Sequence, residues 1–374
     1  MTREPKTTGA VMWDVAKISL EPLDTPQPRD DEVLVRVLSA GICRTDLEIL
    51  DGHLDLLPTP VVLGHEGAGV VEKVGSGVPG LERGDTVILT VASCGRCAAC
   101  RSGRPGYCVQ HGELNFTGAR RDGSTAYTDT RGQPVYSHFF YQSSWATYAV
   151  AHVSNVVKVS PEVDPAVLGP FGCGVLTGAG AVLDVLDVKP GTSIAVFGLG
   201  AVGLVGIMAA KVAGATTIIA VARKKEQLDR AVDVGATHTI DTTEMADVAA
   251  AISEITGKPG ADYSLEATGG PAIMRLAVDV LVETGHCVLT GVAAGATIEL
   301  DPWHIIRGRT VQGTTLGDAD PATLLPRLVD LYRQGRFPID KIESHYPLDQ
   351  LDQAISDSRS GRVAKAVLHP AAMR

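Results

Sequence analysis

Residues Ser193-Ile-Ala-Val-Phe197, followed by Gly198-Leu-Gly200-Ala-Val-Gly203, decide the fold of this chain. A short apolar run typical of a buried strand leads into a G-x-G-x-x-G turn, and an apolar helical pattern follows. Glycines in such a turn let the backbone approach a pyrophosphate, and the helix N-terminus offers unpaired N–H groups. A strand-to-helix turn without a ligand is the alternative. The stretch predicts a dinucleotide site formed by Gly198, Gly200, Ala201, Val202 and Gly203.

The end of the next predicted strand indicates which dinucleotide binds. Enzymes that use NAD usually place Asp or Glu about 20 residues further on, where the acid binds the ribose hydroxyls. Here the strand ends in Ala222-Arg223-Lys224, without an acid. A small residue followed by Arg leaves room for a 2′-phosphate and supplies a charge-assisted donor. We therefore predict a preference for NADP(H). NAD(H) is the alternative, because losing the acid permits NADP without forbidding NAD.

The sequence pattern changes near Gly174. Before it, short β-type runs such as Val33–Leu38 and Thr86–Leu89 are punctuated by glycine and proline, which predicts an irregular β-rich domain. After it, apolar strands alternate with helical patterns, which predicts a parallel sheet covered by helices. We expect an α/β protein in which a doubly wound Rossmann domain, residues 175–316, is inserted into a catalytic domain made of residues 1–174 and 317–374.

Four cysteines form a compact metal-binding pattern. Cys94, Cys97, Cys100 and Cys108 follow the spacing Cys-x2-Cys-x2-Cys-x7-Cys, which can surround one tetrahedral Zn²⁺. Because four thiolates fill every coordination position, this lobe, residues 94–108, is predicted to hold a structural zinc. Only three arginines lie within the lobe, and no basic field surrounds it. A nucleic-acid zinc ribbon is therefore rejected.

Charge and composition restrict the partners and the location. The chain has 33 basic and 43 acidic residues, a formal charge of −10, so we expect no nucleic-acid partner. The polar N-terminus lacks a signal-peptide core, which predicts a cytoplasmic protein. Ile194–Ala210 carries no charge over 17 residues, near the lower limit for a membrane helix. Its glycines favour a strand, turn and helix instead, so we expect no membrane partner.

Three isolated residues are candidates for a second metal site. They are Cys43 in Gly41-Ile-Cys-Arg-Thr-Asp46, His65 in Gly64-His-Glu-Gly67 and Cys173 in Gly172-Cys-Gly174. Two sulfurs and one imidazole would leave the fourth position of a zinc ion open for water or an alcohol. Taken singly, each is more commonly a buried thiol or a core histidine, and spacing alone does not join them.

The flanks of these residues make the chain similar to the zinc-dependent alcohol dehydrogenases of the medium-chain dehydrogenase/reductase superfamily. The resemblance covers nearly the full length and includes, in order, Gly41–Asp46, Gly64–Gly69, the four-cysteine lobe, Gly172–Gly178 and the glycine turn. Ser143–Val150 and Gly169–Ala181 look most like aryl (benzyl) alcohol dehydrogenases. The resemblance implies a GroES-like catalytic domain, two zinc ions, a small alcohol or aldehyde substrate, and a homo-oligomer, either dimer or tetramer.

The resemblance also implies roles at the catalytic zinc. It places the zinc on Cys43, His65 and Cys173, with Glu66 close behind the metal. It makes Asp46 the acceptor of the other imidazole N–H of His65. Such a carboxylate fixes the tautomer and raises the basicity of a histidine ligand.

A proton relay is implied as well. The family uses a hydroxyl at the position of Thr45 to take the proton from the substrate. Many members have a histidine three residues further on, but this chain has Glu48. Glu48, nearby His53 or water then serves as the terminal base, although either residue can also be a solvated surface group.

Further implied contacts concern the cofactor. Arg44 and Lys365 match positions where the family places a cation on the pyrophosphate, and Thr177 matches one against the nicotinamide. A surface salt bridge is the alternative for both cations.

Aromatic residues point to the substrate class. The family places Phe139 and Phe140 near the substrate channel, and Thr90 where some relatives carry a bulky aromatic residue. Apolar rings favour a benzylic, allylic or long-chain primary alcohol, because buried ring surface adds binding. An aromatic core cluster is the alternative. Rival functions are an NAD-dependent zinc alcohol, polyol or formaldehyde dehydrogenase of the same superfamily and a non-catalytic NADPH-binding zinc protein.

Overall fold

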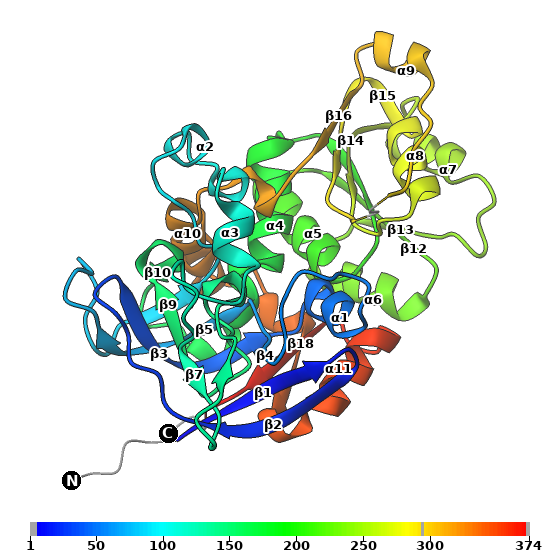
Figure 1. Cartoon of the computed structure of the whole chain (residues 1–374). Coiled ribbons are helices and arrows are strands. Elements are labelled where there is room, and N and C mark those ends of the chain that lie inside the picture. The colour runs from blue at the N-terminus through cyan, green and yellow to red at the C-terminus, as the bar shows by residue number, and fades with distance from the viewer. Residues whose placement is uncertain (1–5, 293–294, 372–374) are drawn as a thin grey trace. The chain divides into compact units, whose positions relative to one another are not determined.

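The computed structural model describes residues 6–292 and 295–371, which form two compact units (Figure 1). The first unit contains the chain up to Cys173, residues 320–330 and the chain from Glu343 onward. The second contains Gly174–Ala319 and Leu331–Ile342. Helix α10 (Pro321–Arg333) therefore begins in the first unit and ends in the second. The C-terminal region is shared between the units, whereas the sequence assigned residues 317–374 to one domain.

The second unit is built on a parallel six-stranded sheet with the order β13-β12-β11-β14-β15-β16. Its strands are β11 (Ser193–Phe197), β12 (Thr217–Ala222), β13 (His238–Asp241), β14 (Ala261–Glu266), β15 (Leu281–Leu289) and β16 (Thr310–Gly313). The strand order reverses between β11 and β14, which creates the switch point where doubly wound sheets bind ligands. The predicted Rossmann sheet is confirmed.

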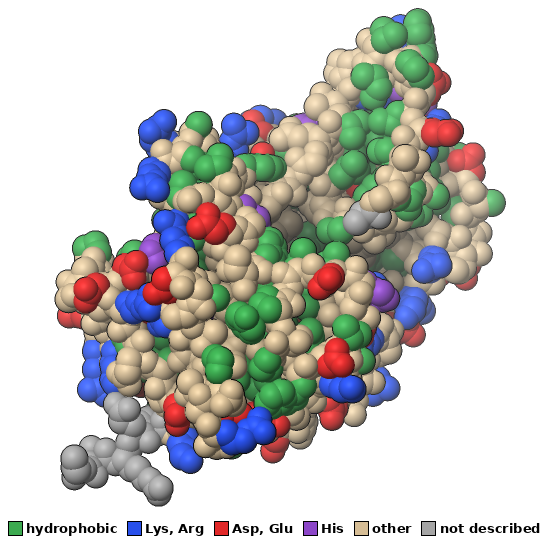
Figure 2. All heavy atoms as spheres, viewed as in Figure 1, with side chains coloured by type: hydrophobic (Ala, Val, Ile, Leu, Met, Phe, Trp, Pro, Cys, Tyr) green, Lys and Arg blue, Asp and Glu red, His purple; other side chains and the backbone are tan. Residues whose placement is uncertain are grey.

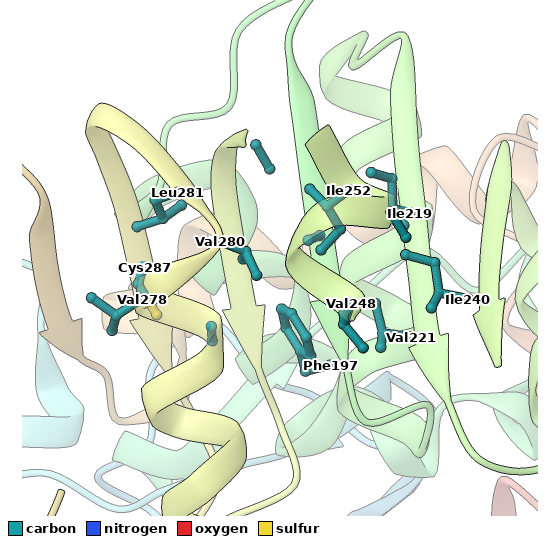
Figure 3. Packing of buried hydrophobic residues seen from close by; sticks show 14 residues of the cluster. Phe197, Ile219, Val221, Ile240, Val248, Ile252, Val278, Val280, Leu281 and Cys287 are labelled. Carbon is teal, nitrogen blue, oxygen red and sulfur yellow. The ribbon is translucent and has the colours of Figure 1, made fainter. Parts of the chain in front are cut away.

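Helices cover both faces of this sheet. They are α4 (Gly174–Gly180), α5 (Ala201–Ala213), α6 (Lys225–Val234), α7 (Val248–Thr256) and α8 (Pro271–Asp279). The short helix α9 (Pro302–Ile306) lies between β15 and β16 in the chain and has no buried residue. Side chains of α7 and α8, including Ile252 and Val278, join one buried cluster with Phe197 (Figure 3). Helix α5 packs on the opposite face so closely that a Cβ at Gly206 would lie 2.3 Å from Leu265 Cδ2.

The first unit is β-rich. Its strands are β1 (Thr7–Asp14), β2 (Lys17–Leu23), β3 (Glu32–Gly41), β4 (Val61–Val62), β5 (Gly67–Val74), β6 (Thr86–Leu89), β7 (Tyr127–Thr128), β8 (Pro134–Val135), β9 (Tyr148–His152), β10 (Val156–Lys158), β17 (Glu343–Pro347) and β18 (Lys365–His369). The largest sheet has the order β10-β6-β5-β3-β18-β17, with β9 also paired to β3. Alternating buried residues of β3, such as Val33 and Val35, contact Val71 and Val87 in its core.

Short helices connect these strands and position the candidate site. They are α1 (Arg44–Leu50), α2 (Ala98–Arg101), α3 (His111–Asn115), α11 (Leu351–Ser360) and the 3-10 turns η2 (Phe139–Tyr141) and η5 (Gly169–Gly172). Strand β18 pairs antiparallel with the end of β3, where Val367 faces Gly41, so the last strand of the chain lies beside the segment that leads into α1. In the described ranges, no helix combines the length and apolar character needed to cross a membrane.

Candidate active site and metal centres

Three distant segments of the first unit bring the predicted catalytic ligands together. Cys43 is the N-cap of α1, His65 lies between β4 and β5, and Cys173 follows η5. One ligand atom from each, together with a carboxylate oxygen of Glu66, lies within 4.8 Å of the others. Because β3 ends immediately before α1 and pairs with β5, the sheet itself holds Cys43 near His65.

The hydrogen bonds of His65 determine which nitrogen faces this cluster. His65 Nδ1 lies 3.0 Å from Asp46 Oδ1, and both side chains are fully buried. Asp46 also accepts hydrogen bonds from the backbone N–H groups of Cys43 and Gly64. With Nδ1–H donating to the carboxylate, the lone pair resides on Nε2, which is buried without a hydrogen-bond partner in the described chain. A metal ion would satisfy this costly buried nitrogen, so the residues fit a zinc ion.

The opposite pKa shifts of the two cysteines in the cluster also fit a site for a cation. A hydrogen bond with Cys173 holds the pKa of Cys43 well below its ordinary value, and the same contact, reinforced by burial, raises the pKa of Cys173. Burial lowers the pKa of His65, but Asp46 and Cys43 raise it by more. Metal binding replaces protons on such ligands, so two thiols that share a proton can become two thiolate ligands.

Lys365 lies directly behind the ligand cluster. Its ammonium forms an ion pair with Glu66 and donates to the carbonyl oxygen of Ile42 at 3.0 Å, and its side chain is only 4% exposed. Burial raises the pKa of Glu66 to about 7, opposed by Lys365. A Cβ at Gly41 would lie 1.9 Å from Glu66 Oε2, so the pair needs this glycine. These contacts neutralise Glu66, and the pyrophosphate role of Lys365 stays a prediction.

The predicted relay residues lie on α1 and in the turn that follows it. Thr45 Oγ1 lies 3.9 Å from Cys43 Sγ. Glu48 forms an ion pair with Arg44, whose side chain is 79% exposed, and lies 2.9 Å from His53 Nδ1. Burial raises the pKa of Glu48, but Arg44 and His53 lower it by more. Arg44 thus has the surface salt bridge that was the alternative to its predicted pyrophosphate contact.

Aromatic rings pack against the buried histidine. Phe140 stacks on His65 at 4.6 Å between ring centroids, and Phe139 meets the same ring edge-on at 5.1 Å. Phe116 lies 5.3 Å from Phe140, and His111 lies 5.5 Å from Phe116. We call Phe116, Phe139, Phe140 and His111 the aromatic wall. The sequence did not point to Phe116 or His111, because nothing local links α3 to η2.

Buried polar side chains hold this region in place. Gln142 donates to the carbonyl oxygen of His65 at 2.9 Å and accepts from Gly67 N, which fixes the segment after η2 against the histidine. Phe140 in η2 has a positive φ of 49°, a strained conformation that such contacts stabilise. Thr90 donates to the carbonyl oxygen of Gly172 at 2.7 Å and so positions the residue before Cys173.

The four predicted structural ligands also converge. The sulfur atoms of Cys94, Cys97, Cys100 and Cys108 lie within 4.8 Å of one another, and all seven cysteines of the chain are free of disulfides. Backbone N–H groups lower the pKa of Cys97 to about 6, whereas burial raises that of Cys100 to about 12. Four sulfurs at this spacing suit tetrahedral zinc.

The glycine turn of the second unit has the shape of a phosphate cradle. Gly198 has a φ of +88°, and a Cβ at Gly203 would lie 1.9 Å from the Gly198 carbonyl oxygen, so both positions require glycine. Gly200 is the N-cap of α5, and among the described residues no atom beyond its two chain neighbours lies within 4 Å of the position its Cβ would take. The unpaired N–H groups at the start of α5 therefore have open space for a dinucleotide pyrophosphate.

Other predicted cofactor residues lie on neighbouring elements of the same unit. Ala222 is the last residue of β12 and is buried, whereas Arg223 and Lys224 are exposed. Thr177 lies half-buried in α4. The sequence missed Glu266 at the end of β14, whose buried carboxylate accepts hydrogen bonds from the backbone N–H groups of the following loop at the switch point.

A doubly wound sheet with an open glycine turn, together with a sulfur and imidazole ligand set, defines a metal-dependent oxidoreductase that uses a dinucleotide. Comparison with known proteins agrees. Residues 29–162 match the alcohol dehydrogenase GroES-like domain, and residues 201–331 match the zinc-binding dehydrogenase domain. The chain belongs to the zinc-dependent alcohol dehydrogenases of the medium-chain dehydrogenase/reductase superfamily, as its motifs predicted.

Individual relatives span nearly the whole chain. A geraniol dehydrogenase of Castellaniella defragrans is 39% identical over 94% of both chains. The crystal structure of an alcohol dehydrogenase zinc-binding domain protein from Burkholderia ambifaria is 48% identical, with a TM-score of 0.95 over 98% of this chain and 99% of that one. A benzyl alcohol dehydrogenase structure from Acinetobacter calcoaceticus is 41% identical, with a TM-score of 0.93 over 98% and 100%.

Proposed function

We propose that this alcohol dehydrogenase interconverts primary aromatic, allylic or long-chain alcohols and their aldehydes, and that it prefers NADP(H) to NAD(H). The stacking of Phe140 on His65 carries the substrate proposal, because it places ring surface directly against the ligand cluster. The similarity to a benzyl alcohol dehydrogenase and a geraniol dehydrogenase supports the same substrate class. The absence of an acid at Ala222, followed by Arg223, supports the cofactor preference.

Cys43, His65 and Cys173 would hold the catalytic zinc, and the four-cysteine lobe would hold a second, structural zinc. The catalytic zinc would supply Lewis-acid polarisation of the substrate oxygen, and the nicotinamide would exchange hydride with the substrate carbon. Asp46 keeps the His65 lone pair on Nε2. Lys365 compensates the charge of Glu66 behind the ligands. A metal count of two zinc ions per chain is expected.

The proton leaves through residues of α1 and the turn that follows it. Thr45 Oγ1 takes the proton of the substrate hydroxyl, and Glu48 with His53 passes it to solvent, since these two side chains are hydrogen bonded to each other. Replacing Glu48 or His53 with Gln should shift the low-pH limb of the turnover profile. An unchanged profile in both variants would assign the last step to water.

A substrate panel tests the proposed class. Benzyl alcohol, geraniol, hexanol, ethanol and sorbitol are compared with NADP and NAD in the wild type and in Phe140→Leu. Losing ring contact should lower kcat/KM for benzyl alcohol by about tenfold and for hexanol by much less. Phe337→Leu, a change of a buried residue in the second unit, is the control. Higher kcat/KM for sorbitol than for benzyl alcohol would favour a polyol dehydrogenase instead.

We further propose that the protein forms a homo-oligomer through the edge of the second unit's sheet. Strand β16 ends the sheet order. Trp303 and Ile306 of α9, the helix before it in the chain, are 60% and 74% exposed. A second copy can cover both the apolar residues and the unpaired edge, because a twofold axis makes the surface self-complementary. Light scattering should give at least a dimer for the wild type and a smaller species for Ile306→Glu. Identical masses would exclude this interface.

A further inference from the structure

The first unit contains a polar cavity of about 310 Å³ that the proposed reaction does not use. It borders the four-cysteine lobe, since Cys94 and Arg96 line it, and Arg29, Arg120 and Arg121 line its other sides. Figure 2 shows basic side chains gathered over α2 in this lobe, whose only basic residues are arginines. The volume is at the lower end of the range for small-molecule sites. A concave site rich in arginine is unusual in a chain whose formal charge is −10.

Two of the four arginines are neutralised by carboxylates. Arg120 is buried and binds both oxygens of Glu32, at 2.7 and 2.8 Å. Arg29 pairs with Asp122 at 2.8 Å, but the two side chains are 46% and 55% exposed. Such an exposed pair contributes little stability, so Arg29 can exchange this partner for a ligand at small cost.

The other two arginines have no carboxylate partner among the described residues. The Arg96 guanidinium makes no hydrogen bond there, and Arg121 Nη2 donates only to Gln110 Oε1, at 2.9 Å. The remaining acid of the lining, Asp31, is 62% exposed and lies 3.5 Å from His152 Nε2. The four arginines thus outnumber Asp31, Glu32 and Asp122, and the excess of positive charge faces the cavity.

We propose that this cavity binds a small oxyanion of the phosphate type between the guanidinium groups of Arg96 and Arg121. Planar guanidinium donors match phosphate oxygens in pairs, and such charge-assisted hydrogen bonds are strong. Arg96 lies between two zinc-lobe cysteines, whereas Arg121 lies in the loop after α3. A bound anion would therefore tie the lobe to the β-rich body of the unit. The site is separate from the proposed redox chemistry and does not depend on it.

Titration calorimetry with inorganic phosphate tests the site. The full-length, zinc-loaded protein is used at constant ionic strength and in an Arg223→Ala background, which removes the proposed contact to the cofactor 2′-phosphate. Phosphate should bind to the double variant Arg96→Gln/Arg121→Gln about tenfold more weakly than to the parent protein. Gln110→Glu should weaken phosphate binding by a similar factor. This isosteric change gives Arg121 a carboxylate partner within the protein, which competes with phosphate for the guanidinium. Arg101→Gln/Arg131→Gln, which removes two arginines outside the cavity, should bind as the parent does.

Three results would overturn the proposal. They are the absence of any heat of binding in the parent, undiminished binding in both cavity variants, and equal weakening in the control pair, which would indicate only general charge attraction. Thermal unfolding of each variant verifies its fold. If the double variant does not fold, Gln110→Glu decides, because it changes no buried contact and no cysteine ligand.

Discussion

At the scale of single residues, the catalytic ligand set depends on one buried carboxylate. Asp46 accepts hydrogen bonds from His65 Nδ1 and from the backbone N–H of Cys43, so it orients two of the three proposed ligands at once. Its side chain is fully buried. Asp46 therefore determines both the tautomer of the imidazole and the entry angle of α1.

Replacing Asp46 with Asn should weaken the catalytic zinc site without affecting the lobe. The amide keeps one acceptor but removes the charge that makes His65 a good ligand, so the affinity for one of two zinc ions should fall by about 10- to 100-fold. Competition with a chromophoric chelator measures this loss. Asp51→Asn, which alters an acid after α1, is the control. Equal retention of both ions in Asp46→Asn would contradict the assigned role.

At the scale of elements, the end of β12 determines the environment of the adenosine ribose. Ala222 is buried at the carboxyl edge of the sheet, next to β11 and its glycine turn, and Arg223 follows it into solvent. An anionic 2′-phosphate would meet a methyl group and a guanidinium at this edge. The proposed NADP preference therefore rests on two adjacent residues of one strand end.

Ala222→Asp should reverse this preference. The new carboxylate repels a 2′-phosphate and can bind the ribose hydroxyls, so the ratio of kcat/KM for NADP to that for NAD should fall by at least about tenfold. Initial rates with both cofactors measure it. Ala222→Ser adds volume without charge and should change the ratio much less. An unchanged ratio in the Asp variant would defeat the NADP assignment.

Elements with local patterns were predictable, and contacts between distant elements were not. The run Ser193–Phe197 and the turn after it are visible in the sequence because strand period and glycine spacing are local. The ligands Cys43, His65 and Cys173 were recognised by their flanks, since each looks ordinary alone. Phe116 left no sequence signal, because the ring it contacts belongs to a different element. The Lys365 pair with Glu66 was missed for the same reason.

At the scale of the whole molecule, buried histidines connect stability to pH. His138 is fully buried, and burial holds its pKa below the ordinary value although Glu32 opposes this. Burial likewise lowers the pKa of His111, His152, His286 and His345. Below about pH 6.5 the unfolded chain binds protons that these folded sites exclude. The free energy of unfolding should therefore decrease as the pH falls from 7 to 5.

Urea unfolding at several pH values, with zinc content monitored, tests this dependence. In His138→Gln, the free energy of unfolding should depend less steeply on pH, by up to about 1.4 kcal/mol per pH unit for one proton. This reduction is expected whatever the substitution does to stability at neutral pH. His238→Gln, which changes an exposed histidine, should retain the wild-type slope. Parallel profiles for wild type and His138→Gln would show that His138 contributes nothing to acid sensitivity.

The pairing of β18 with β3 affects how the protein is made. Lys365 emerges from the ribosome 323 residues after Ile42, whose carbonyl oxygen it binds, and synthesis of the intervening chain takes on the order of tens of seconds. During that interval the nascent sheet has an open edge, and Glu66 has no ammonium to compensate it. Stable loading of the catalytic zinc is therefore expected only after release of the finished polypeptide. A premature stop before codon 365 would leave every ligand present but the site without its counter-charge.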